Sequence, residues 1–270
     1  MFKRILTYTG ITLLVAMAAA YFCFAARLFA DKSGERICKM VSVEILDSTL
    51  NKFVSKEEVV KLINEYDGPV AGKSCDNINL GNLELMLNRR SAIRESQVSL
   101  TRDGLMKVEI TQRRPLLRIE TSGGGFYIDE FEYIFPLSES FTSYVPVVSG
   151  HIPLDLNAGF RGEAEDEDTP WITKIMELGR FLNENPFWGA MIEQIYVAEN
   201  GDLILSPKVG EIKIILGRPD DIEQKFRKLL AFYRNIAPEK GWTRYSEVNL
   251  KYKGQIVCKL NNTPLKIKES

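Results

Sequence analysis

The sequence is poor in residues that build metal and redox sites. It contains one histidine, His151, and four cysteines, Cys23, Cys38, Cys75 and Cys258. No cysteines are spaced as Cys-x-x-Cys, so the sequence supports neither a zinc site nor a thioredoxin-like redox motif. We therefore expect no metal. Cys38 with Cys75 is the one pair that we consider for a disulfide, and the alternative of reduced, buried thiols stays open.

An excess of charge of either sign is also missing. The formal net charge is −1, with 45% apolar and 26% charged residues. This balance is ordinary for globular material and indicates neither a nucleic-acid-binding surface nor a polyacidic tail. We therefore expect no nucleic-acid partner.

Recognisable catalytic motifs are absent as well. No Walker loop, His-Glu-x-x-His or dinucleotide fingerprint occurs, and no Gly-x-Ser-x-Gly elbow accompanies His151. Gly123-Gly124-Gly125 lacks the Lys-Ser/Thr and the helix of a phosphate-binding loop, so it predicts a turn. The acidic stretch 163–168 lacks the spacing of an EF-hand. We expect no enzyme, no cofactor and no small-molecule substrate.

Because the sequence contains many carboxylates, glycoside hydrolysis is the one kind of catalysis that stays open. Asp129, Glu132, Asp202 and Glu247 show no spacing typical of glycoside hydrolysis. Because such pairs are brought together by the fold, spacing alone does not exclude them.

A long apolar run is the most prominent feature that is present. No charge occurs from Ile5 to Ala26, and Lys3 and Arg4 precede the run. A helix needs roughly 20 apolar residues to cross a bilayer, and flanking basic residues favour the cytoplasmic side. We predict a cytoplasmic tail at 1–9, a transmembrane helix at 10–30 and a linker at 31–37. A cleaved signal peptide is the alternative, although Cys23-Phe24 makes a poor cleavage box.

A compact module is predicted next, over residues 38–114. Residues 39–46 alternate as a half-buried strand, and Ser55 with Glu58 forms a capping box that opens a helix. A second helix is expected over 80–90, and strands 94–100 and 106–112 flank the hairpin signal Asp103-Gly104. The order is βααββ.

Short strands dominate residues 115–260. Helices are expected over 171–185 and from Ile222 to Tyr233, and Asn200-Gly201 predicts a hairpin between 192–197 and 202–206. The stretch 245–260 reads as the closing strand or strand pair, and 261–270 as a polar tail. We predict an α+β protein whose second domain is a mostly antiparallel sheet with two helices.

Open sheets of this kind have edge strands that can accept a partner strand. The C-terminal strand is the natural candidate. The alternative is that Tyr252 and Val257 only pack the sheet, and periodicity does not separate the two interpretations.

Several motifs together resemble the bacterial FtsQ/DivIB cell-division family. They are Val108-Glu109-Ile110-Thr111-Gln112-Arg113-Arg114-Pro115, Tyr127-Ile128-Asp129 before Ile134-Phe135-Pro136, Leu216-Gly217-Arg218 with Lys225-Phe226, and Glu247-Val248-Asn249-Leu250-Lys251-Tyr252. Gln112 stands where the family has Glu, and Phe131 or Glu132 where it commonly has Gly. The first module resembles a POTRA domain of that family.

The resemblance implies a non-enzymatic scaffold at the division septum. It implies a single-pass inner-membrane protein with a cytoplasmic N-terminus and periplasmic domains, linking early and late division proteins to septal peptidoglycan synthesis. FtsB-like and FtsL-like proteins and other divisome membrane proteins are the implied partners. Strand addition is implied at five residues: Tyr252, Gly254, Gln255, Val257 and Lys259.

Two other functions remain as alternatives. One is a POTRA-bearing translocation or envelope-assembly component, although these usually carry several POTRA repeats. The other is an anchored cell-wall hydrolase.

Overall fold

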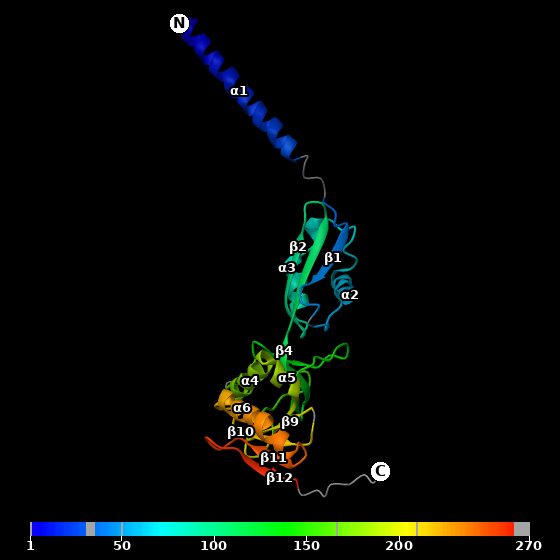
Figure 1. Ribbon diagram of the computed structural model, residues 1–270. Coiled ribbons are helices and arrows are strands. Elements are labelled where there is room, and N and C mark those ends of the chain that lie inside the picture. Colours follow the sequence, from blue (N-terminus) through cyan, green and yellow to red (C-terminus); the bar gives the residue numbers. More distant parts are fainter. Residues whose placement is uncertain (1, 31–35, 50, 166, 209, 262–270) are drawn as a thin grey trace. The chain divides into compact units, whose positions relative to one another are not determined.

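The computed structural model describes residues 2–30, 36–49, 51–165, 167–208 and 210–261, with side chains of the N-terminal helix from 13 to 27. Two compact units follow from its contacts: Met1–Ile45, Lys56–Leu87 and Ser96–Ile110 form the first, and Leu46–Ser55, Asn88–Glu95 and Thr111–Ser270 form the second (Figure 1). Most of the predicted linker 31–37 and of the predicted tail 261–270 lies outside the described residues.

Helix α1 spans Phe2–Ala30. Its described apolar side chains, including Leu13, Met17 and Phe22, are largely exposed. Among helices in the described part of the chain, none is both long enough and apolar enough to cross a membrane. The predicted transmembrane helix is therefore not confirmed.

The first unit has the predicted βααββ order. Its elements are β1 (Met40–Ile45), α2 (Lys56–Asp67), the short 3₁₀ helix η1 (Cys75–Asn77), α3 (Leu80–Asn88), β2 (Ile93–Leu100) and β3 (Leu105–Gln112). Strand β3 lies between β1 and β2, and it runs parallel to β1. Val59, Leu62 and Ile63 of α2 are buried, as are Leu83 and Leu87 of α3. One apolar face of each helix thus covers the small sheet.

Cys38 and Cys75 are both buried free thiols. The Cys38 N–H donates to Lys73 O at 2.8 Å and the Cys75 N–H, at the start of η1, donates to Arg36 O at 2.6 Å, so the segments that carry the two cysteines are adjacent. Burial, and secondarily the nearby Cys75, raises the pKa of Cys38. A raised pKa leaves less thiolate, which is the reactive form.

A sheet of nine strands forms the second unit, in the spatial order β12-β11-β10-β9-β8-β7-β4-β5-β6. Five of its eight pairings are antiparallel and three are parallel. The prediction of a mostly antiparallel sheet agrees with this count. The strands are β4 (Pro115–Thr121), β5 (Gly124–Asp129), β6 (Ile134–Pro136), β7 (Val147–Gly150), β8 (Ile192–Val197), β9 (Leu203–Pro207), β10 (Lys213–Gly217), β11 (Tyr245–Asn249) and β12 (Val257–Leu260).

The helices of this unit are more numerous than the predicted two. They are α4 (Thr169–Glu184), α5 (Pro186–Met191), α6 (Ile222–Ala231), the π-helical turn η2 (Phe232–Ile236) and α7 (Ala237–Lys240). Asn185 alone separates α4 from α5, and Pro186 starts α5 because proline suits the first turn of a helix. Pro238 has no N–H, and just before it the Ala237 N–H bonds to Phe232 O, five residues back. A hydrogen bond that spans five residues, where an α-helix spans four, defines the π-helical turn.

Helices cover one face of this sheet, and the other face is covered at β5 and β6, whereas Tyr196 of β8 on that face is 40% exposed. Buried residues of α4, α5, α6 and η2 form one core with strand residues such as Leu117, Ile195 and Val248. On β5 and β6, Tyr127 and Phe135 contact the ring of Phe53, at 5.6 and 5.9 Å between ring centroids.

A tight turn follows β5. The Asp129 carboxylate is fully buried and accepts hydrogen bonds from the N–H groups of Phe131 (2.9 Å) and Tyr133 (3.0 Å). Glu132 has a φ of 66°, in the left-handed region that favours glycine. Of the two positions at which the resemblance implied a Gly, Phe131 and Glu132, only Glu132 therefore has the backbone conformation that favours it. In this chain Glu132 also bonds Arg180 at 2.7 Å.

Candidate protein-interaction surface

Strand β12 is an exposed edge of the large sheet. Among the described strands it pairs with β11 alone, at one end of the strand order. The opposite edge, β6, is covered because Ile134 and Gly162 exchange two backbone hydrogen bonds, of 2.8 and 3.0 Å. An edge strand presents unpaired N–H and C=O groups, so β12 is suited to receive an added strand.

The side chains of β12 alternate between the two sides of the sheet. Cys258 lies opposite the buried Val248 and packs against the core. Val257 lies opposite Asn249 and Lys259 lies opposite Glu247, and both of these β12 side chains are exposed. The predicted residues Val257 and Lys259 therefore share one side of the edge strand, away from the core.

The other three predicted residues lie in the connection from β11 to β12. Tyr252, Gly254 and Gln255 are all exposed, with Tyr252 at 49%. Gly254 has a φ of +73°, and an added Cβ would meet no atom within 4 Å. The backbone conformation favours glycine there, and the space beside it is open. All five predicted residues thus lie on one continuous, accessible stretch of chain.

Lys228 of α6 holds this connection in place. Its Nζ donates to Leu250 O at 2.6 Å, Tyr252 O at 2.7 Å and Gln255 O at 3.5 Å. An ammonium group has three donors, and three carbonyls satisfy them. Burial, and secondarily Lys225, lowers the pKa of Lys228. Sequence reasoning missed this residue, since a lysine on an amphipathic helix is expected to face solvent.

The start of the connection is also anchored. The Leu250 N–H donates to Ile215 O of β10 at 2.9 Å. The Lys251 ammonium bonds the Asp202 carboxylate at 2.5 Å, and this carboxylate raises the pKa of Lys251. With Lys228, these bonds preorganise the segment that leads into β12, so less ordering is needed when a partner binds.

Three basic side chains lie along the edge and beside it, and Glu247 lies opposite one of them, Lys259. Lys253, Lys259 and Arg244 are all exposed there. Lysines on an edge strand oppose uncontrolled pairing with other strands. They also favour a partner segment that carries acidic residues.

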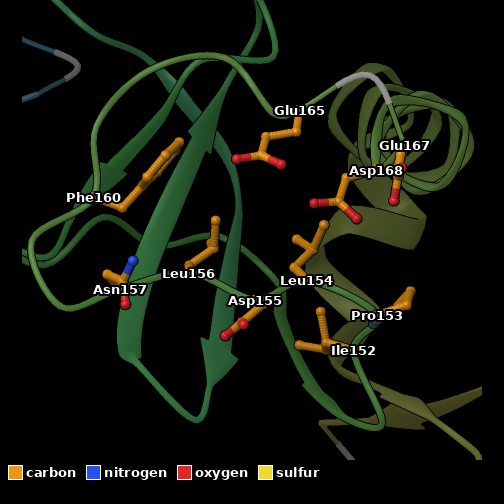
Figure 2. Close-up of a pocket in the computed structure, with 10 residues that line it drawn as sticks. All are labelled: Ile152, Pro153, Leu154, Asp155, Leu156, Asn157, Phe160, Glu165, Glu167 and Asp168. Atoms are coloured by element: carbon orange, nitrogen blue, oxygen red, sulfur yellow. The ribbon is translucent and has the colours of Figure 1, made fainter.

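A cavity of about 590 Å³ lies elsewhere in the same unit. Figure 2 shows Leu154 and Leu156 in its interior, with the carboxylates of Glu165 and Asp168 on one side and Asp155 on the other. Asp168 immediately precedes α4, where negative charge stabilises a helix N-terminus. Within the described residues, no group of three or more His, Cys, Asp or Glu side chains is placed to hold a metal ion.

The residues weighed for catalysis are dispersed and mostly paired. His151 Nε2 lies 3.6 Å from Glu199 on the surface. Asp129 pairs with Arg113, Glu132 with Arg180 and Asp202 with Lys251. The three glycines 123–125 lie in the β4–β5 hairpin, where Gly124 pairs with Thr121, which confirms the predicted turn.

Comparison with known proteins identifies both parts of the chain. Residues 114–259 match the family model "FtsQ/DivIB, C-terminal related", and residues 36–111 match the model of a POTRA-like domain. A search among curated proteins returned no match. Domains of these two kinds are generally non-catalytic. Because the first match covers more than half of the sequence, the chain belongs to the FtsQ/DivIB family.

Proposed function

We propose that this protein is a non-enzymatic scaffold of the bacterial division machinery that binds an FtsB-like partner by strand addition at β12. Membership of the FtsQ/DivIB family indicates a division-related scaffold. The observation that carries the finer proposal is the exposed edge strand β12, preceded by a connection that Lys228 anchors at 2.6 Å and 2.7 Å. Through an FtsL-like protein and other divisome membrane proteins, the complex would link early division proteins to septal peptidoglycan synthesis.

Replacing Tyr252 with glutamate tests this proposal. The side chain is 49% exposed, so the domain should stay folded while the substitution removes apolar contact area beside the edge. We expect affinity for the soluble segment of the cell's own FtsB-like protein to fall about 30-fold, a loss typical of an interface hot spot. Isothermal titration calorimetry on the full chain in detergent measures it.

Tyr66→Glu is the matched control, because Tyr66 is 54% exposed but lies on α2. It should leave the affinity unchanged. In cells depleted of the native protein, the Tyr252 variant should give filaments or chains, whereas the Tyr66 variant should restore division. Equal affinities for the two folded variants would contradict strand addition at β12.

We also propose that residues 10–30 hold the protein in the inner membrane, with the N-terminus cytoplasmic and the two domains periplasmic. The apolar side chains of α1 support this, because Leu14, Met17, Phe22 and Phe24 are each more than 60% exposed. An uncovered apolar surface of this kind is unfavourable in water. Confinement to one membrane would also raise the effective concentration of single-span partners.

Alkaline carbonate extraction tests the anchor. The full chain should stay in the membrane pellet, because an apolar span resists extraction, and a variant without residues 2–30 should be released. Release of the full chain, or a mature N-terminus near Ala26, would show that the segment is no anchor.

A further inference from the structure

An aromatic groove of about 600 Å³ lies on the helical side of the second unit. It is formed by α5, the end of α6, η2 and the segment that leads into β11. Its lining residues are Asn185, Pro186, Phe187, Trp188, Met191, Leu230, Tyr233, Arg234 and Trp242. Its lining, mainly apolar and aromatic side chains with a few polar groups, is typical of binding pockets.

Two exposed rings form the mouth of the groove. Trp242 is 60% exposed and stacks on Tyr233, with 5.9 Å between ring centroids and 25° between ring planes. Phe187 is 55% exposed and meets Trp188 edge-on at 4.8 Å. Large apolar side chains held in fixed positions at the surface mark an interaction site.

The π-helical turn η2 helps to shape this groove. Tyr233 and Arg234 lie within the turn, so its wider winding sets where their side chains leave the helix. π-Helical turns occur frequently at functional sites.

The groove opens where β12 ends. Leu260 pairs with Tyr245, and the Asn261 N–H donates to Arg244 O at 2.8 Å. Trp242 is two residues before Arg244, so the mouth of the groove adjoins the end of the β12 edge. The side-chain amide of Asn261 also donates to Thr243 O at 3.4 Å, so a segment paired along β12 and continuing past Leu260 would run toward Trp242.

The charge around the groove restricts its occupant. Arg234 is exposed and takes part in none of the ion pairs observed among the described residues. Arg244 and Lys259 add positive charge near the end of β12. Apolar walls beside an unpaired guanidinium fit an aromatic or leucine side chain that has an acidic neighbour.

We propose that this groove is a second anchor point for the partner that binds β12. It takes an aromatic or leucine side chain of that partner, and Arg234 pairs with an adjacent carboxylate. The inference rests on the proposed strand addition for its choice of occupant. It differs in locating part of the binding energy on α5, η2 and Trp242, away from the strand itself.

Trp242→Ala in the full chain tests the groove, with the soluble segment of the cell's FtsB-like protein as the probe. We expect a loss of affinity of about 30-fold, as for a hot-spot aromatic residue. Phe187→Ala should weaken binding in the same direction, and it serves as the second variant if Trp242→Ala is unstable. Arg234→Glu should weaken binding and flatten its dependence on salt. Tyr144→Ala, at a residue 75% exposed outside the groove, is the control.

The outcomes separate this inference from the proposed function. Loss of binding in Tyr252→Glu but not in the groove variants overturns the groove and leaves strand addition standing. Loss only in the groove variants supports the groove and overturns strand addition. Full binding in all of them overturns both.

Two other occupants would also overturn the inference. If deletion of residues 262–270 raises affinity for the probe and Trp242→Ala has the same effect, the chain's own tail fills the groove. If sedimentation shows self-association of the full chain that Trp242→Ala abolishes, a second copy fills it.

Discussion

Replacing Asp129 with alanine is expected to lower the free energy of unfolding of the second unit by about 3–5 kcal/mol, because it leaves a guanidinium without its buried partner. The carboxylate is fully buried and bonds Arg113 Nη1 at 2.8 Å. Arg113 also donates to Ser91 O at 3.1 Å and stacks on the ring of Tyr133 at 3.4 Å. The guanidinium is therefore held in place and cannot turn to water when the carboxylate is removed.

Urea denaturation followed by tryptophan fluorescence measures this loss. All three tryptophans, Trp171, Trp188 and Trp242, belong to the second unit, so the signal reports on it selectively. Asp129→Asn is the matched control, because it keeps an acceptor for the N–H groups of Phe131 and Tyr133 and removes the charge alone. We expect an intermediate loss. Equal stability of Asp129→Ala and the native chain would show that the ion pair does not stabilise the turn.

Replacing Phe226 with alanine is expected to cost about 3–5 kcal/mol, the usual range for deleting a buried phenyl ring. Phe226 is 1% exposed and lies on the inner face of α6. Its ring centroid is 4.6 Å from that of Phe181 and 5.0 Å from that of Trp188. The substitution leaves a cavity where α4, α5 and α6 meet, and the surrounding rings cannot fully close it.

The same denaturation experiment measures this effect, with Phe131→Ala as the control. Phe131 is 61% exposed, so its loss should cost less than about 1 kcal/mol. Since Trp188 also lines the aromatic groove, Phe226→Ala should weaken probe binding even where the protein is still folded. A midpoint unchanged in Phe226→Ala would contradict the described packing of α6.

Most individual elements could be predicted because their signals are local. The Ser55 capping position, the Asp103-Gly104 turn and the Asn200-Gly201 turn each act over a few residues. The structure places α2 at Lys56–Asp67 and joins β8 to β9 at the predicted hairpin. Apolar periodicity likewise identified the buried faces of α2, α4 and α6, except that Tyr66, which the period places with Val59, Leu62 and Ile63 on α2, is 54% exposed because it lies in the last turn of the helix.

The number of helices was not predictable with the same rules. Pro186 and Pro238 occur in stretches that read as the end of one helix, yet each begins another. A proline excludes the helical hydrogen bond before it but permits the turn after it. Whether a new helix begins at the proline or the chain continues as a loop depends on whether the next residues have a core to pack against.

At the candidate interaction surface, too, the local features could be predicted from the sequence and the long-range contacts could not. The sequence indicated that 245–260 closes a sheet and that Tyr252 to Lys259 offers both apolar and polar side chains. The strand order, which makes β12 an edge, depends on pairings between strands far apart in the chain. The Lys228 ammonium is 22 residues from Leu250, whose carbonyl it binds, and no periodic pattern encodes a contact at that separation.

By itself, then, the sequence determined the α+β class, the βααββ module, most element boundaries and the motifs that resemble the FtsQ/DivIB family. Only the tertiary structure decided that β12 is exposed, that Lys228 anchors the approach to it, and that Trp242 and Tyr233 form a groove beside its end. The physical reason is that helices, strands and turns follow from interactions between near neighbours in the chain. An accessible edge and a groove are instead properties of surfaces that the chain assembles from distant segments.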